Sequence, residues 1–456
     1  MGKKFDFDYI VIGSGPAGAT TALALAKAKK EVAIVEGESF GGSAVNSRDV
    51  PYGISLDFAH TFSKLSNSPE TSTQDAHFNF PTIVSHSEGI SSILSDEYKQ
   101  SFLAAGISCF EGYANFIDSN TIVVGSTQIT AAHFIIATGA HLKTNEIAGL
   151  DAVNYLTPAT AIRSRRLPKA ALVVGGGASG CEIAAYFAEL GAKVLIMERA
   201  SHLLPNEDKE VGKTIQEYFE NELGMMVLTG SKVVALEQDN VSKRVVFNVD
   251  GREKMVRVDC IVLATGSQPT VDCGLENAGV NYKNAGIIVD KGFQTSAKNI
   301  YAVGDCVNTK NSSFELAEYE GNLLASNLIH RTKNPIDFVG FARVINTNPE
   351  VAVIGANEYD LLKQDKKCKK SLVELKDTFA GKIHQPCYGF VKLLADSSNH
   401  IIGATIVAPN ASALSGEIAL AIRSRITASE LANIPHVSTS FGAAIKTAAK
   451  NLTKTA

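Results

Sequence analysis

The sequence predicts an α/β protein with two βαβ units of the same design, followed by a C-terminal region of mixed α and β character. Three observations support this prediction. A glycine-rich turn of the same spacing occurs twice, at residues 13–18 and 175–180. Each turn is followed at a distance by an apolar strand that ends in Ala-Thr-Gly. Beyond residue 336 the chain changes character, and neither feature recurs.

The composition is that of a multidomain globular protein. The chain has 456 residues, of which 45% are hydrophobic and 20% are charged, and its formal net charge is −4. This length exceeds one ordinary hydrophobic core, so two to four domains are expected. The small negative charge argues against nucleic acid as a partner.

The N-terminal apolar stretch and the cysteines exclude several classes of protein. Glycines and Pro16 interrupt the apolar stretch from Tyr9 to Ala26, which predicts a strand, a turn and a helix, and no membrane span or signal peptide. The seven cysteines form no close pair in the sequence. This pattern argues against a disulfide framework and against a metal site, and it makes the cytoplasm the expected location.

The first unit begins with an apolar run at residues 9–12 and continues through Gly13-Ser14-Gly15-Pro16-Ala17-Gly18 into an Ala/Leu-rich helix. In a dinucleotide-binding unit the first glycine makes the tight turn, the second lets the backbone approach a pyrophosphate, and the third allows close packing of helix and strand. The next strand ends in Glu36, 18 residues after Gly18. A carboxylate at this distance can hold a pair of ribose hydroxyls.

The second unit repeats the plan with Gly175-Gly176-Gly177-Ala178-Ser179-Gly180 and with Glu198, again 18 residues after the last glycine. A single motif of this kind is a weak signal, because a glycine-rich turn between strand and helix can be purely structural. Two copies with the same spacing favour two dinucleotide sites.

The segment between the two units contains Pro158, Pro168 and the basic run Arg163-Ser164-Arg165-Arg166. Prolines and clustered charges are typical of a boundary between domains. The basic run is expected to be a solvated face of the linker, with a specific anion site as the alternative.

With these features the chain resembles the flavoprotein pyridine nucleotide-disulfide oxidoreductases, such as dihydrolipoamide dehydrogenase, glutathione reductase and mercuric reductase. The resemblance covers nearly the whole chain, and its most specific element is Asn299-Ile300-Tyr301-Ala302-Val303-Gly304-Asp305. It implies two Rossmann-like FAD/NAD(P)-binding domains and a C-terminal α+β interface domain that forms a homodimer. The expected boundaries are residues 1–149 and 268–335 for the FAD domain, 150–267 for the NAD(P) domain, and 336–456 for the interface domain.

The resemblance also implies which residues bind the cofactors. In the family, the equivalent of Asp305 binds the ribityl chain of FAD, whereas on its own it would be a helix cap. The expected FAD-binding residues are Gly13, Gly15, Gly18, Glu36, Gly42, Ser43, Ala114, Thr138, Gly139, Asp305, Leu316 and Ala317. The expected NAD(P)-binding residues are Gly175, Gly177, Gly180, Glu198 and Gly266. Glu198 favours NADH over NADPH, whereas the adjacent Arg199 favours the phosphate of NADPH.

The redox-active cysteine pair of the family is missing from its expected position. Ala44 and Asp49 occupy the two places, and neither side chain can attack a disulfide. Gly53 replaces a lysine that lies near the flavin, although the usual partner of this lysine survives as Glu182. Arg48 and Asp49 are therefore the residues expected to shape the acceptor site.

The acid–base pair of the family is also changed, because Ser438 and Ala443 stand where a histidine and a glutamate are usual. His436 lies two residues away, and the sequence identifies no carboxylate that would orient it. It is expected to be a loop histidine, with a role in proton transfer as the alternative. Asp49 has two comparable interpretations: a helix cap, or a proton donor at the flavin face.

These observations predict an FAD-dependent NAD(P)H oxidoreductase that passes electrons directly to a small acceptor such as a quinone, a dye or oxygen. One alternative is a dihydrolipoamide dehydrogenase-like enzyme whose thiols come from elsewhere in the chain. The other is a non-catalytic subunit that binds flavin or nucleotide and senses redox state.

Overall fold

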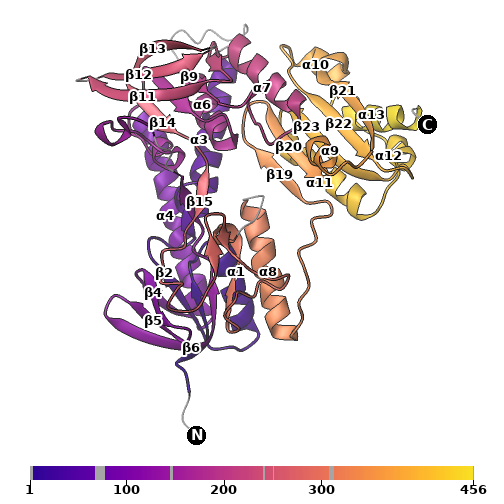
Figure 1. The fold of residues 1–456 in the computed structure, drawn as a ribbon. Helices are drawn as coiled ribbons and strands as arrows, with labels where there is room; N and C mark the ends of the chain where they lie inside the picture. The colour runs from indigo at the N-terminus through magenta and orange to yellow at the C-terminus, as the bar shows by residue number, and fades with distance from the viewer. Residues whose placement is uncertain are drawn as a thin grey trace.

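The computed structural model describes residues 4–66, 78–143, 147–239, 242–249, 251–307 and 313–454. Figure 1 shows an N-terminal sheet at the bottom, a second α/β unit at the top and a C-terminal sheet with its helices at the right. The long helix α4 (Phe80–Ala104) runs from the first unit to the second.

The N-terminal sheet has the strand order β3-β2-β1-β6-β5-β4, and β18 joins it beside β6. The pairings β1–β2, β1–β6 and β6–β18 are parallel, with Ile10 opposite Ala33 and Phe134, and Phe134 opposite Ile300. The strands are β1 (Phe7–Ile12), β2 (Val32–Glu36), β3 (Ser108–Glu111), β4 (Ala114–Asp118), β5 (Thr121–Val124), β6 (Thr127–Ile136) and β18 (Ile300–Ala302).

Helices α1 (Pro16–Lys27) and α8 (Phe314–His330) pack closely against each other beside this sheet. A Cβ atom at Gly321 would lie 2.4 Å from the Ala17 carbonyl oxygen, so only glycine permits this approach. Pro16 fits the first turn of α1, where a backbone N–H has no helical partner.

The second unit repeats the arrangement in a parallel sheet of order β10-β9-β8-β14. Its parallel strands are β8 (Ala170–Val174), β9 (Lys193–Met197), β10 (Met226–Leu228) and β14 (Cys260–Leu263). An antiparallel sheet lies beside it, formed by β11 (Lys232–Asp239), β12 (Ser242–Val249) and β13 (Arg252–Val258). Its helices are α5 (Pro158–Ala161), α6 (Ala178–Glu189) and α7 (Lys209–Asn221).

The two segments that connect the units run side by side as the antiparallel pair β7 (Ala140–Leu142) and β15 (Ser267–Pro269). A small hairpin of β16 (Tyr282–Lys283) and β17 (Gly286–Ile287) follows. The units also share a core, because Tyr52 and Leu56 of α3 (Asp49–Ser66) belong to the same buried cluster as Ile183 of α6. The preceding short helix is α2 (Gly42–Asn46).

The C-terminal region forms an antiparallel sheet of order β19-β20-β23-β22-β21. Its strands are β19 (Ala342–Ile345), β20 (Glu350–Gly355), β21 (Lys369–Glu374), β22 (Phe390–Ala395) and β23 (Ile401–Ala408). Its helices are α9 (Glu358–Lys363), α10 (Phe379–Ile383), α11 (Ala411–Arg423), α12 (Ala428–Asn433) and α13 (Ala443–Lys454). The two repeated parallel units and this α+β region confirm the predicted fold class.

A buried lysine joins the C-terminal sheet to the second unit. The side chain of Lys392 on β22 is 1% exposed, and its Nζ lies 2.8 Å from Asp208 Oδ2, 2.9 Å from Glu358 Oε2 and 3.3 Å from Glu210 Oε2. Burial alone would lower the pKa of Lys392, but hydrogen bonds to Asp208 and Glu358 outweigh it and raise this pKa. Lys392 is therefore a charged link between two regions of the fold.

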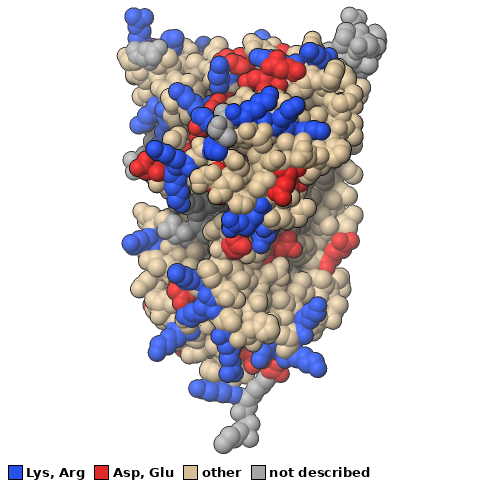
Figure 2. All heavy atoms as spheres, turned by 90° about the vertical axis from the view of Figure 1, so that its right-hand side faces the viewer, with Lys and Arg blue, Asp and Glu red and all other residues tan. Residues whose placement is uncertain are grey.

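The surface carries charges of both signs. Figure 2 shows acidic and basic side chains interspersed with wide uncharged areas on the side of the C-terminal sheet. In the basic run of the linker, Arg163 and Arg165 contact Glu88 of α4, at 3.9 Å and 2.5 Å. Within the described ranges, no helix is both long enough and apolar enough to cross a membrane.

Candidate active site

The two glycine-rich turns have the same geometry. Gly13 and Gly175 have φ values of +100° and +109°, and a Cβ atom at either would lie 2.3 Å from a carbonyl oxygen of the neighbouring strand end. Gly18 and Gly180 pack against these turns so closely that a Cβ atom would lie 2.0 Å and 1.9 Å from the Gly13 and Gly175 oxygens. These four positions require glycine for turn geometry and close packing.

The middle glycine of each motif is open instead. A Cβ atom at Gly15 or Gly177 would meet no protein atom within 4 Å. Each of these glycines is the N-cap of its helix, and no side chain caps the helix there. The free N–H groups of the first turn are thus available to an anion, which is the arrangement that pyrophosphate requires.

Both predicted ribose-binding glutamates are buried at the ends of their strands, and each also holds its glycine turn. Glu36 Oε2 accepts hydrogen bonds from the Ser14 N–H at 2.9 Å and from its hydroxyl at 2.5 Å. Glu198 Oε2 accepts from the Gly176 N–H at 2.7 Å, and its Oε1 accepts from the Ala200 N–H at 2.7 Å. The sequence predicted the position of these carboxylates but not their bonds to the turns.

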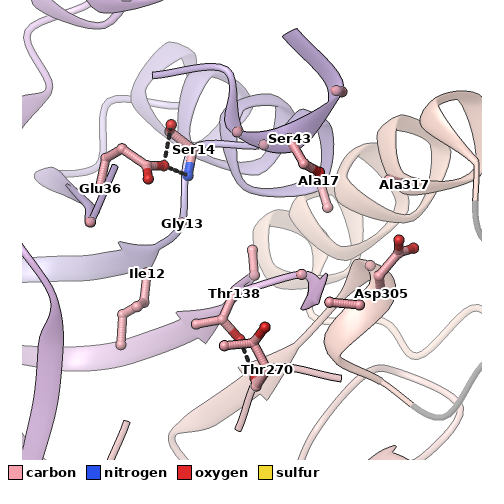
Figure 3. Close-up of a pocket in the computed structure, with 18 of the residues that line it drawn as sticks. Ile12, Gly13, Ser14, Ala17, Glu36, Ser43, Thr138, Thr270, Asp305 and Ala317 are labelled. Carbon is pink, nitrogen blue, oxygen red and sulfur yellow. Dashed lines mark hydrogen bonds between the residues drawn. The ribbon is translucent and has the colours of Figure 1, made fainter. Parts of the chain in front are cut away.

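A cavity lies at the first glycine turn (Figure 3). In this view Glu36 lies on one side of the turn, and Asp305 lies across the cavity beside Ala317 of α8. Thr138 is fixed in the wall because its hydroxyl donates a 2.6 Å hydrogen bond to the Thr270 carbonyl oxygen. The predicted FAD-binding residues that line the cavity are Gly13, Gly15, Glu36, Gly42, Ser43, Ala114, Thr138, Gly139, Asp305 and Ala317.

Two other predicted FAD-binding residues lie behind the wall of this cavity. Gly18 is buried under the turn, where it permits the packing described above. Leu316 is 3% exposed and forms part of the buried face of α8, whereas its neighbour Ala317 lines the cavity. In the second unit, Gly266 has a φ of +101° and lies between the end of β14 and the start of β15.

Arg48 lies at the end of the cavity among three carboxylates. Its Nη1 donates a hydrogen bond to Asp305 Oδ2 at 3.3 Å. Burial alone would lower the pKa of the guanidinium, but the charges of Asp49, Asp305 and Glu182 outweigh it and raise this pKa. Arg48 is therefore a fixed positive charge that connects α2–α3 to the Asp305 turn.

Asp49 is the first residue of α3, and it also lines the cavity. Asp49 is exposed to solvent, and the nearby protein atoms desolvate its carboxyl group only in part; they raise its pKa, and Arg48 opposes this effect. Asp49 is therefore both the first residue of α3 and a residue of the cavity wall.

Glu182 lies on α6 with a side chain that faces the C-terminal region. Its Oε1 accepts hydrogen bonds from the Asn346 backbone N–H at 2.8 Å and from the Asn346 side chain at 3.3 Å. Burial raises the pKa of Glu182, and Asn346 and Arg48 oppose this shift. Gly53, where the resemblance implies a lysine, is exposed, and the hydrogen-bond partner of Glu182 is Asn346.

His436 has an orienting carboxylate, which the sequence did not identify. Its Nε2 lies 2.9 Å from Glu417 Oε1, and its Nδ1 lies 3.0 Å from the Ile434 carbonyl oxygen. Glu417 belongs to α11, and a separation of 19 residues between two elements gives no local sequence signal. Ser438 is exposed in the same loop before α13.

Cysteines and metal ions are the alternative redox groups for such a site. The only cysteine that lines this cavity within the described part of the chain is Cys273. Burial raises its pKa to about 12, so its sulfur is a thiol at neutral pH and a poor nucleophile. No group of three or more His, Cys, Asp or Glu side chains among the described residues is placed to hold a metal ion.

The fold and these two nucleotide sites define a two-dinucleotide flavoprotein oxidoreductase. A family model described as pyridine nucleotide-disulphide oxidoreductase matches residues 7–321, and the dimerisation domain of the same family matches residues 341–449. The chain belongs to the pyridine nucleotide-disulphide oxidoreductase family.

Several relatives are similar to the chain over most of its length. A mercuric reductase of Staphylococcus aureus is 30% identical over 432 residues, which cover 93% of this chain and 79% of the relative. A dihydrolipoyl dehydrogenase of Chlamydia pneumoniae is 28% identical, with 92% of each chain covered. The crystal structure of LpdA from Mycobacterium tuberculosis is 27% identical and has a TM-score of 0.86, with 97% of this chain and 99% of that chain covered.

The family binds FAD and NAD(P)H, and the residues present here fit both cofactors. The open middle glycines and uncapped helix N-termini suit pyrophosphate, and the carboxylates at the strand ends suit ribose. When bound, FAD would supply the chemistry of hydride and electron transfer between NAD(P)H and a second substrate. The protein contributes the binding, the orientation and the local charges.

Proposed function

We propose that this protein is an FAD-dependent NAD(P)H oxidoreductase that reduces a small acceptor directly, without a redox disulfide. The proposal rests on which residues occupy α2 and the start of α3. Ala44 is buried in α2 and Asp49 lines the cavity, where thiols would be needed for disulfide exchange. A quinone, a dye-like molecule or oxygen needs no thiol step.

The charges at Arg48 and Asp49 support this proposal. The guanidinium of Arg48 can donate hydrogen bonds to the oxygen atoms of a quinone, and it also donates one to Asp305. The carboxyl group of Asp49, with its raised pKa, can carry a proton at the same end of the cavity. The side chains there thus provide a positive charge and a proton donor.

The experiment is anaerobic stopped-flow reduction of the holoprotein with NADH, followed by mixing with quinones, disulfides, dihydrolipoamide or oxygen. We expect rapid reduction by NADH and rapid reoxidation by quinone or oxygen. Fast exchange with disulfides or dihydrolipoamide would favour the dihydrolipoamide dehydrogenase-like alternative. Reduction by NADH too slow to support turnover would favour a redox-sensing subunit.

Asp49→Asn should slow the reduction of the acceptor about tenfold while FAD remains bound. The carboxamide keeps the shape but carries no transferable proton, and water replaces only part of a general acid's contribution. Because the pKa of Asp49 is raised, the wild-type rate should fall as pH rises above the ordinary aspartate range. The measurement is the pH profile of flavin reoxidation by a quinone.

Asp57→Asn is the matched control, since Asp57 is an exposed residue of the same helix. It should leave the profile unchanged. If Asp49→Asn also keeps the wild-type pH profile and flavin reduction potential, Asp49 has only a structural role at the helix start.

NADH should be preferred over NADPH by about tenfold in kcat/KM, a ratio that corresponds to about 1.4 kcal/mol. The carboxylate of Glu198 is held at the end of β9 by two backbone N–H groups, where it would bind a 2′-hydroxyl and repel a 2′-phosphate. Arg199→Ala should leave the NADH value unchanged, because Arg199 is exposed. A preference for NADPH in the wild type would refute this assignment.

We also propose that the protein is a homodimer, with Ser438 and His436 near the partner's cavity. Five large apolar side chains in the described part of the dimerisation domain are more than half exposed: Leu362 (70%), Phe379 (69%), Ile383 (58%), Leu420 (65%) and Val437 (69%). A partner subunit would cover such side chains. The three domain boundaries and the cytoplasmic location remain predictions.

A further inference from the structure

Glu320 is a buried carboxyl group directly behind the Asp305 turn. It lies on α8 and is 1% exposed. Its Oε2 accepts a 2.8 Å hydrogen bond from the backbone N–H of Gly304, whose φ of +75° shapes the turn that places Asp305 in the cavity wall. Glu320 is therefore in direct contact with the backbone that carries a cofactor-binding residue.

The second oxygen of this carboxyl group is not satisfied. Glu320 Oε1 is buried and has no hydrogen-bond partner among the residues that the structure describes. Ionisation of Glu320 costs free energy here, because the carboxylate loses its hydration and gains only one N–H donor. The neutral form of Glu320 is therefore favoured.

The negative charge of Asp305 also favours the neutral form of Glu320. Burial raises the pKa of Glu320 to about 7, the Gly304 N–H lowers it, and the charge of Asp305 raises it. On the same turn Cys306 remains a neutral thiol, because burial raises its pKa to about 12. From α1, which packs against this part of α8, Ala17 and Thr21 contact the neighbouring Gly321, and neither is charged. The cation at this turn is Arg48, which donates to Asp305 Oδ2, and no described residue donates to Glu320 Oε1.

We propose that Glu320 is a positioning residue that makes FAD binding depend on pH. Its neutral carboxyl group supports the Gly304–Asp305 turn, and its ionisation weakens cofactor binding by placing a buried negative charge beside Asp305. The FAD diphosphate is itself anionic, so bound FAD disfavours the ionised form, and by linkage the ionised form disfavours FAD. Affinity is then highest below the pKa of Glu320 and falls as pH rises through it.

The test is the dissociation constant of FAD, measured from flavin fluorescence between about pH 6 and pH 9. Wild-type protein should bind FAD about tenfold more weakly at about pH 9 than at about pH 6. This ratio is expected if FAD binding raises the pKa of Glu320 by about one unit. Glu320→Gln should abolish this dependence, since the amide is neutral throughout. Glu318→Gln is the matched control on the exposed side of α8, and it should behave as the wild type.

Two outcomes would overturn the proposal. One is wild-type affinity that does not change with pH, a result that needs no variant. The other is a pH dependence that survives in Glu320→Gln or, if that variant does not fold, in Glu320→Met, which has a similar volume and no titratable group. The experiment contains no nicotinamide and no acceptor, so its result does not depend on the proposed reaction.

Discussion

Dithionite should reduce the purified holoprotein completely with two electrons per FAD. A thiol–disulfide couple stores two further electrons, so a relative with a redox-active cysteine pair should require four. On the proposed assignment Ala44 and Asp49 occupy the pair's positions, and burial keeps Cys273, the cysteine in the described cavity wall, a neutral thiol. The measurement is an anaerobic titration followed by flavin absorbance.

The chain offers a direct control for this titration. The double variant Ala44→Cys with Asp49→Cys restores a thiol at both positions, and we expect it to take up four electrons per FAD. A wild-type protein that already requires four electrons, or that shows a thiolate-to-flavin charge-transfer band at half reduction, would contradict the proposed absence of a redox disulfide.

Gly180→Ala and Gly177→Val should both reduce NADH-dependent flavin reduction about 100-fold or more, but for different reasons. In Gly180→Ala the new Cβ atom would lie 1.9 Å from the Gly175 oxygen, which forces α6 away from the turn. Overpacking of this kind costs about 3 kcal/mol or more. In Gly177→Val the side chain enters open space next to the uncapped helix N-terminus, where it blocks the pyrophosphate.

Thermal unfolding distinguishes the two variants. Gly180→Ala should unfold at a clearly lower temperature, whereas Gly177→Val should unfold close to the wild type. FAD content and reduction by dithionite should remain unchanged in both, because the first glycine turn is intact. Normal NADH reduction in Gly177→Val would show that the second turn does not bind the nucleotide.

The parts of this structure that could be predicted from the sequence depend on short-range geometry. The two glycine turns were predicted with their individual roles, because each role follows from a spacing of a few residues between strand and helix. The open positions at Gly15 and Gly177 and the close packing at Gly18 and Gly180 agree with these roles.

The interactions that sequence reasoning missed connect distant segments. Arg48 and Asp305 are 257 residues apart, and Glu182 and Asn346 are 164 residues apart. No local pattern encodes such contacts, since they depend on how separate elements pack. The burial of Glu320 could have been predicted from the sequence. Glu320 lies four residues from both Leu316 and Leu324, and it therefore interrupts the apolar face of α8.

The ion pairs of Lys392 restrict which substitutions and which domain exchanges this protein can tolerate. If Lys392 were replaced by a neutral residue, Asp208, Glu210 and Glu358 would be left as neighbouring carboxylates with their common cation removed. Two of these acids belong to the second α/β unit, and Glu358 belongs to the C-terminal region. Chimeras that exchange the C-terminal region with that of a relative should therefore assemble only when all four positions are transferred together.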